Sequence, residues 1–165
     1  SLNCFWRKDG EPIWNAPELY ANESVNYGAT AEHAQRFLKR VAEAGIKNIH
    51  AQCLDIFKNP PAGSFDLIFS GMAMHHVPDT DALLKTLTGL LAPGGFIALA
   101  DLDTEDGTFH GEDAGPVHHG FDRKELIHRI RTCGVVETTT ITANTMHKTG
   151  RDYLVFLLTA RKPGK

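Results

Sequence analysis

Residues 65–101 read FDLIFSGMAMHHVPDTDALLKTLTGLLAPGGFIALAD, and this stretch decides the fold. It begins with FDLIFS, a short and nearly all-apolar run that is typical of a central parallel strand covered on both faces. The Pro-Asp pair at 78–79 then begins a helix whose leucines recur on one face, and Pro-Gly-Gly at 93–95 ends it. Residues 96–102 form a second buried strand. The stretch therefore predicts a strand–helix–strand unit.

The flanking sequence continues this alternation. A helical pattern over residues 30–45 is followed by an alternating strand over 46–54. A capping box over 122–125 begins another helix, and the runs 135–143 and 153–160 form a terminal β-hairpin. Strands joined through helices form a parallel sheet, to which the hairpin adds one antiparallel strand.

We therefore predict one domain over residues 1–165, of the α/β class. It is a Rossmann-like, mostly parallel sheet with helices on both faces and a C-terminal antiparallel hairpin. With 42% hydrophobic and 22% charged residues, the composition is that of an ordinary globular protein. The net charge of −3 gives no sign of a basic nucleic-acid-binding face, so we expect a small-molecule substrate and no nucleic acid.

The cellular environment is predicted from the cysteines and the hydropathy pattern. The chain has an odd number of cysteines, and they are widely spaced: Cys4, Cys53 and Cys133. Both features disfavour a disulfide framework and a zinc site. We find no apolar run long enough for a transmembrane helix and no signal-peptide pattern. We expect a cytoplasmic protein without a membrane partner, and the sequence leaves a homodimer open.

Three segments together resemble the class I S-adenosylmethionine (SAM)-dependent methyltransferases. The first is residues 65–101, where that family has a buried FDL strand, a helix, a Pro-Gly-Gly turn and a further strand. The second is LDIFKNPPAGSFD at 54–66, and the third is DLDTEDGTFHGEDAGPVHHGFDRKEL at 101–126, which is similar to one bacterial subgroup. The resemblance covers about residues 30–165. It implies a seven-stranded sheet with an antiparallel last strand and SAM as the cofactor.

The resemblance also implies where SAM would lie. Asp55 matches the position that accepts a hydrogen bond from the adenine amino group, and Leu54 and Ile56 flank the adenine ring. Ser70 and Gly71 match the strand end that passes beside the methionine moiety.

The first 29 residues are atypical of this family. The family has a glycine-rich loop after its first strand and an acidic residue at the end of its second strand. In the same register, this chain has Gly10 as the only loop glycine, bulky residues over 5–8, and Gly28 in place of the acid. A second interpretation makes residues 3–14 a β-hairpin that turns at Asp9-Gly10.

His75 and His76 are the candidate catalytic residues. They follow the FDLIFS strand, and the resemblance places them near the cofactor sulfonium. A histidine there is suited to deprotonating a substrate hydroxyl or amine near neutral pH. The alternative is structural: one histidine packs under the helix and the other is solvated.

A polar loop after residue 102 has three interpretations: a solvated loop, a substrate lid or a metal site. We expect no metal, because the spacing of the ligand-type residues matches no known motif. Those residues are His110, Glu112, Asp113, His118 and His119, together with Asp101, Asp103, Glu105 and Asp106.

The sequence favours a SAM-dependent methyltransferase that acts on a small-molecule acceptor. The rival hypothesis is a non-catalytic relative that keeps the scaffold but binds a partner or dimerises. A flavin or NAD protein is less well supported, because no G-x-G-x-x-G follows a strand.

The atypical first segment predicts weak SAM binding. Loss of the acid at Gly28 removes a hydrogen bond to the ribose worth roughly 1.5–3 kcal/mol, or about tenfold to a hundredfold in affinity. Calorimetric titration with SAM and S-adenosylhomocysteine measures this directly. Glycines in place of Phe5 and Arg7, with an acid in place of Gly28, should raise the affinity. Low-micromolar binding by the unmodified chain would contradict the prediction.

Overall fold

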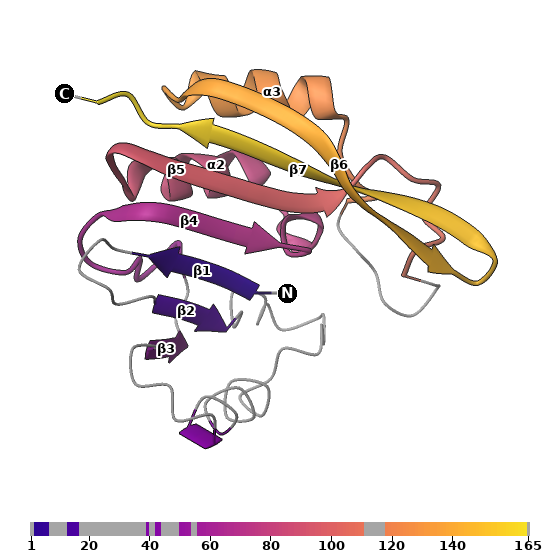
Figure 1. Ribbon diagram of the computed structural model, residues 1–165, viewed down its shortest axis with the longest axis horizontal. Coiled ribbons are helices and arrows are strands. Elements are labelled where there is room, and N and C mark those ends of the chain that lie inside the picture. The colour runs from indigo at the N-terminus through magenta and orange to yellow at the C-terminus, as the bar shows by residue number, and fades with distance from the viewer. Residues whose placement is uncertain are drawn as a thin grey trace.

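The fold is a single seven-stranded sheet in the order β3-β2-β1-β4-β5-β7-β6 (Figure 1). It is seen in a computed structural model that describes residues 2–6, 13–16, 39, 42–43, 50–53, 56–110 and 118–164. The strands are β1 Leu2–Trp6, β2 Ile13–Ala16, β3 His50–Cys53, β4 Phe65–Gly71, β5 Leu91–Leu102, β6 Val136–Lys148 and β7 Arg151–Arg161.

The predicted strand–helix–strand unit is confirmed as β4, α2 and β5. β4 and β5 are parallel neighbours, and the helix α2 (Thr80–Gly89) connects them. α2 begins where the sequence predicted, because the Asp79 side chain accepts a hydrogen bond from Ala82 N at 2.8 Å. The Pro-Gly-Gly segment differs from the prediction, since it lies inside β5 rather than before it. Pairing of Leu91 with Phe65 begins the strand earlier than the local sequence indicates.

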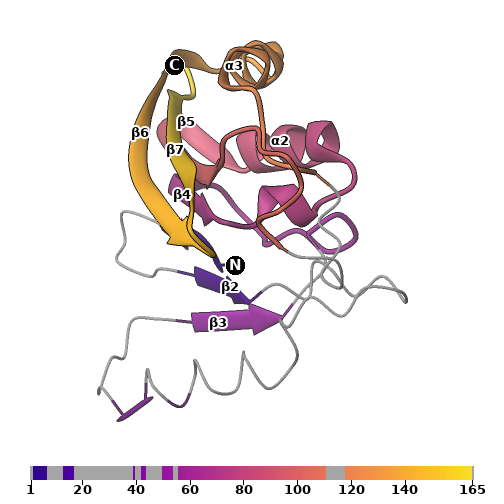
Figure 2. The same ribbon diagram turned by 90° about the vertical axis from the view of Figure 1, so that its right-hand side faces the viewer.

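The two described helices cover the same face of the sheet (Figures 1 and 2). The second, α3 (Arg123–Thr132), begins at Asp122, whose side chain accepts from Glu125 N at 2.8 Å. On the opposite face, Phe96 and Leu67 are 47% and 38% exposed. Of the predicted helix over 30–45, only Lys39, Ala42 and Glu43 are described, and they are helical.

The main hydrophobic core lies between the helices and β4, β5 and β7. It is made of buried aliphatic and aromatic side chains that include Ile68, Leu84, Leu87, Ile97, Leu99, Leu126, Ile130, Phe156 and Leu158. Within the described parts of the chain, no helix combines the length and apolarity needed to cross a bilayer.

The first residues form a hairpin, as the second interpretation of this segment predicted. β1 pairs antiparallel with β2, and Cys4 lies opposite Trp14. β1 also pairs antiparallel with β4, so the family-type interpretation, with a parallel first strand, is wrong for residues 2–6. The reason is that LNCFW and IWNA are strand-forming runs separated by a turn signal. Gly10 and Gly28 lie outside the described residues.

This hairpin changes the meaning of the proposed glycine replacement. Phe5 pairs with Ile13 on one side and Ile68 on the other. Glycine at this position would weaken a strand interior as well as alter the loop.

The C-terminal hairpin is confirmed. β6 and β7 are antiparallel, and β7 also pairs antiparallel with β5. The tip of the hairpin extends beyond the rest of the sheet (Figure 1).

Gly120 fixes the return of the loop after β5. An isolated parallel bridge joins Asp103 to Phe121, and it brings the Gly120 backbone against Asp103. With φ at +73°, a Cβ atom at Gly120 would lie 2.0 Å from the Asp103 carbonyl oxygen. Gly134 has a similar φ of +83° but nothing within 4 Å of such an atom.

We predict that Gly120→Ala destabilises the fold far more than Gly134→Ala. The Gly134 variant should lose about 1–2 kcal/mol for the left-handed backbone alone. The Gly120 variant should lose at least about 1 kcal/mol more, because the bridge must also break. Urea denaturation of both variants measures the difference, and equal losses would contradict the described loop.

Candidate functional site

The candidate site lies where β4 and β5 end side by side. Gly71 pairs with Ala100, and Met72 N donates to Ala100 O at 2.8 Å. Met72 then adopts a φ of +53°, a left-handed conformation that is uncommon outside glycine and often found at functional sites. The chain turns at this point into the short 3-10 helix η1 (Met74–His76).

Asp101, at the end of β5, anchors this turn. Its Oδ2 accepts from the backbone N–H groups of Met74 at 2.8 Å and His75 at 3.4 Å. Its Oδ1 accepts from Leu102 N at 2.8 Å and from His75 Nδ1 at 2.5 Å. The carboxylate is fully buried, and these four donors replace the water that burial removes.

The Asp101 bond fixes the tautomer of His75. Since Nδ1–H donates to the carboxylate, Nε2 of the neutral ring carries the lone pair. His110 Nε2 lies 2.9 Å from that nitrogen and donates to it. His75 is only 1% exposed, so both of its ring nitrogens are engaged inside the protein.

His76 completes a group of three imidazole rings. Its ring centroid lies 4.0 Å from that of His75 and 5.0 Å from that of His110. Burial, followed by the neighbouring His75 and His110, lowers the pKa of His76 to about 3. Burial and the neighbouring His75 also lower the pKa of His110. Both shifts favour the neutral ring forms of His76 and His110.

The C-terminal hairpin positions the segment that carries His110. Lys148 Nζ donates to the carbonyl of Phe109, and its ammonium lies 4.8 Å from the centre of that ring. Thr108 Oγ1 and Tyr153 Oη are hydrogen-bonded at 2.7 Å. Arg151 pairs with Asp106 at 2.6 Å. The segment 103–110 is thus packed against β6 and β7.

The rest of this loop is mostly structural. His118 donates from Nε2 to Val77 O at 2.9 Å, and the backbone N–H of His118 donates to His75 O at 3.0 Å. His119, 57% exposed, lies 3.4 Å from the buried Glu105 carboxylate. Asp103 forms a two-pronged ion pair with Arg123 at the start of α3. His118, Glu105 and Asp103 are therefore held by contacts within the protein, while His119 is exposed to solvent. Glu112 and Asp113 lie outside the described residues.

The predicted cofactor residues are only partly visible. Ser70 is buried at the end of β4, and its Oγ has no hydrogen-bond partner in the described part of the chain. Gly71 follows it, beside the Phe69 ring. Ile56 is fully buried in the main core. Leu54 and Asp55 lie outside the described residues, so their predicted contacts with the adenine remain untested.

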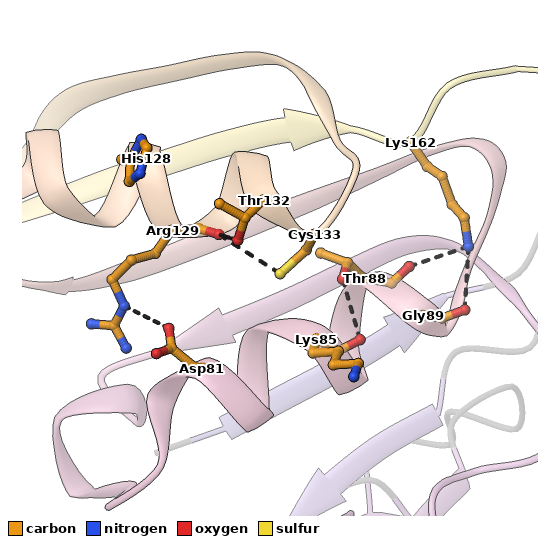
Figure 3. A pocket seen from close by; sticks show the side chains of 9 residues that line it. All are labelled: Asp81, Lys85, Thr88, Gly89, His128, Arg129, Thr132, Cys133 and Lys162. Atoms are coloured by element: carbon orange, nitrogen blue, oxygen red, sulfur yellow. Dashed lines mark hydrogen bonds and ion pairs between the residues drawn. The ribbon is translucent and has the colours of Figure 1, made fainter.

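A separate hollow of about 670 Å³ lies between α2 and α3 (Figure 3). Asp81 and Arg129 are ion-paired across it at 2.7 Å. Lys162 donates to the carbonyl oxygens of Thr88 and Gly89 at its other end. The Asp81–Arg129 pair joins α2 to α3, and Lys162 binds the carbonyl groups at the end of α2. The hollow is not part of the histidine site.

Sequence reasoning named His75, His76 and Asp101 but did not connect them. Two features of the sequence could have connected them. Asp101 ends the apolar run FIALAD, and the neighbouring run FDLIFS ends shortly before the two histidines. Carboxyl ends of adjacent parallel strands meet at one edge of a sheet.

Comparison with known proteins finds a methyltransferase domain family and several methyltransferases that are similar to part of the chain. Residues 25–97 match a family model described as a methyltransferase domain. An uncharacterized methyltransferase of Mycobacterium tuberculosis is 39% identical over 70 residues, which is 42% of this chain and 34% of that protein. These matches support a methyltransferase domain over residues 25–97.

Solved structures of methyltransferases share the fold. The N-methyltransferase NodS of Bradyrhizobium japonicum has a TM-score of 0.60 at 19% identity, covering 81% of this chain and 70% of that one. Phosphoethanolamine N-methyltransferase 2 of Haemonchus contortus, solved with SAM, has a TM-score of 0.61 at 14% identity, covering 76% and 40%. The matched part of this chain spans 26% of the length of the methyltransferase str2 of Strobilurus tenacellus and 34% of that of the mycobacterial relative.

We predict that Asp101→Asn destabilises the fold by about 3 kcal/mol or more, because the amide points a donor at groups that are themselves donors. Asp152→Asn is the matched control. Asp152 also pairs with a histidine, His147, but both side chains are largely exposed, so the loss should stay below about 1 kcal/mol. Urea denaturation measures both, and histidine ¹⁵N shifts report the His75 tautomer. Similar small losses would contradict the described role of Asp101.

Proposed function

We propose that this methyltransferase domain transfers a methyl group from SAM to a small-molecule acceptor. The observation that carries the proposal is the buried Asp101–His75 pair beside the end of β4, where the family passes the cofactor's methionine moiety. Methyl transfer is an in-line displacement, and the protein chiefly supplies alignment of the two reactants. A rigid turn held by a buried carboxylate is suited to that task.

The cofactor would lie along the carboxyl ends of β3 and β4. Leu54, Asp55 and Ile56 would contact the adenine. Ser70 and Gly71 would lie beside the methionine moiety. The buried Ser70 Oγ, which lacks a partner in the described chain, supports a polar ligand there.

The two candidate catalytic histidines would have different roles. His75 uses both ring nitrogens within the protein and therefore positions its neighbours. His76 is partly exposed and stays neutral, so its ring can accept a hydrogen bond from the nucleophilic group of the acceptor. A full proton transfer is required only if that group carries a proton in the reactive complex.

A non-catalytic partner-binding protein is the second candidate. The observation that favours it is the β1–β2 hairpin, because β1 runs opposite to the parallel first strand that the family uses to present its glycine-rich loop. Calorimetry separates the two functions: no detectable binding of SAM or S-adenosylhomocysteine at millimolar ligand would favour this candidate.

We expect Asp55→Ala to weaken SAM binding by about 1–2 kcal/mol, the loss of one hydrogen bond to a buried partner. Asp152→Ala, at the exposed hairpin tip, should leave the affinity unchanged. Calorimetric titration gives both values, and formation of S-adenosylhomocysteine with small amines, thiols and alcohols tests turnover. Unchanged affinity in a folded Asp55 variant would remove this residue from the proposed site.

A further inference from the structure

Three histidines converge at the carboxyl edge of the sheet. His75 and His76 come from η1, and His110 comes from the loop after β5. One ring nitrogen of each lies within 4.8 Å of the corresponding atoms of the others. Imidazole nitrogens are ligands for zinc, copper, iron and nickel.

The surroundings of His75 are those of a metal-binding histidine. Such a ligand almost always donates its second ring N–H to a carboxylate or carbonyl, which fixes the ring and its tautomer. Asp101 has this role here, because it accepts from His75 Nδ1 at 2.5 Å and leaves the Nε2 lone pair facing the other two rings. Four donors in turn hold Asp101.

The distances require only a small adjustment. Zinc–nitrogen bonds of about 2.0–2.1 Å place tetrahedral ligand atoms about 3.3–3.4 Å apart. The Nε2 atoms of His75 and His110, now 2.9 Å apart, would separate slightly, and the widest pair would close from 4.8 Å. The proton on His110 Nε2 would move to Nδ1 of the same ring, which frees the Nε2 lone pair for the ion. His76 and His110 are both partly exposed, so their side chains have room to rotate, whereas His75 is fixed.

We propose that His75, His76 and His110 bind one zinc-like divalent transition-metal ion. Three protein ligands leave a fourth tetrahedral position for a water molecule or for the oxygen, nitrogen or sulfur atom of a ligand. The sequence pattern does not reveal this site, because two ligands are adjacent in the chain and the third is 35 residues away from His75. In the proposed methyl transfer, the acceptor would then coordinate the ion instead of hydrogen-bonding to His76. Only this point about the acceptor rests on the proposed function.

The test is binding of Zn²⁺ alone to the chelator-treated full chain, without SAM. Calorimetry should show one zinc ion per chain with low-micromolar or tighter affinity. Co²⁺ in its place should give the visible absorption of a tetrahedral site. His110→Ala should weaken zinc binding by about 100-fold or more, because even an outer-shell partner of a ligand contributes about 10–100-fold. His76→Gln, a second ligand variant, should show the same loss.

His147→Ala is the matched control, because this histidine is exposed on the C-terminal hairpin, pairs with Asp152 and is not one of the three grouped rings. It should bind zinc as the unmodified chain does. Circular dichroism and urea denaturation identify any variant that fails to fold, and a folded ligand variant then decides. Absence of zinc binding, or equal binding by the two ligand variants and the unmodified chain, would overturn the proposal. Zinc binding is measured without SAM, so the two proposals can fail separately. A chain that binds zinc but not SAM contradicts only the proposed function. A chain that binds SAM but not zinc contradicts only the metal site.

Discussion

The Asp101 carboxylate joins the end of β5 to the turn that follows β4. A buried charge without partners is costly, so the four donors from Met74, His75 and Leu102 must stay in place for this charge to remain inside. They in turn fix the 3-10 helix and the orientation of the His75 ring. The position of the histidine group thus follows from the electrostatics of one side chain.

A second layer of contacts holds the other half of the site. Asp103, two residues after Asp101, pairs with Arg123 at the start of α3, and Phe121 bridges back to Asp103. On the other side of the loop, Lys148 and Tyr153 hold Phe109 and Thr108. His110 follows directly, so its placement depends on contacts from both α3 and the hairpin.

Local patterns predicted β4, α2, β5, α3 and the terminal hairpin, because an apolar period and a capping residue act within a few positions of one another. The beginning of β5 was not predictable in this way, because Leu91 joins the strand through its pairing with Phe65, which is 26 residues earlier in the chain. The first segment left two interpretations open, and its pairing with β4 selected the hairpin. The contact of His75 with Asp101 spans 26 residues and that with His110 spans 35, and no short-range signal encodes either.

The place of β7 in the sheet has a consequence for synthesis on the ribosome. β7 follows β6 in the sequence but lies between β5 and β6 in the sheet, where Phe96 is paired with Arg161. Chains emerge N-terminus first, so β5 lacks this neighbour until α3, β6 and β7 have been translated. Lys148 and Tyr153, which hold the loop before His110, also appear late. Until β6 and β7 are present, β5 has β4 as its neighbour but lacks the strand that later covers its other edge, and Phe109 and Thr108 lack the contacts that hold the loop before His110.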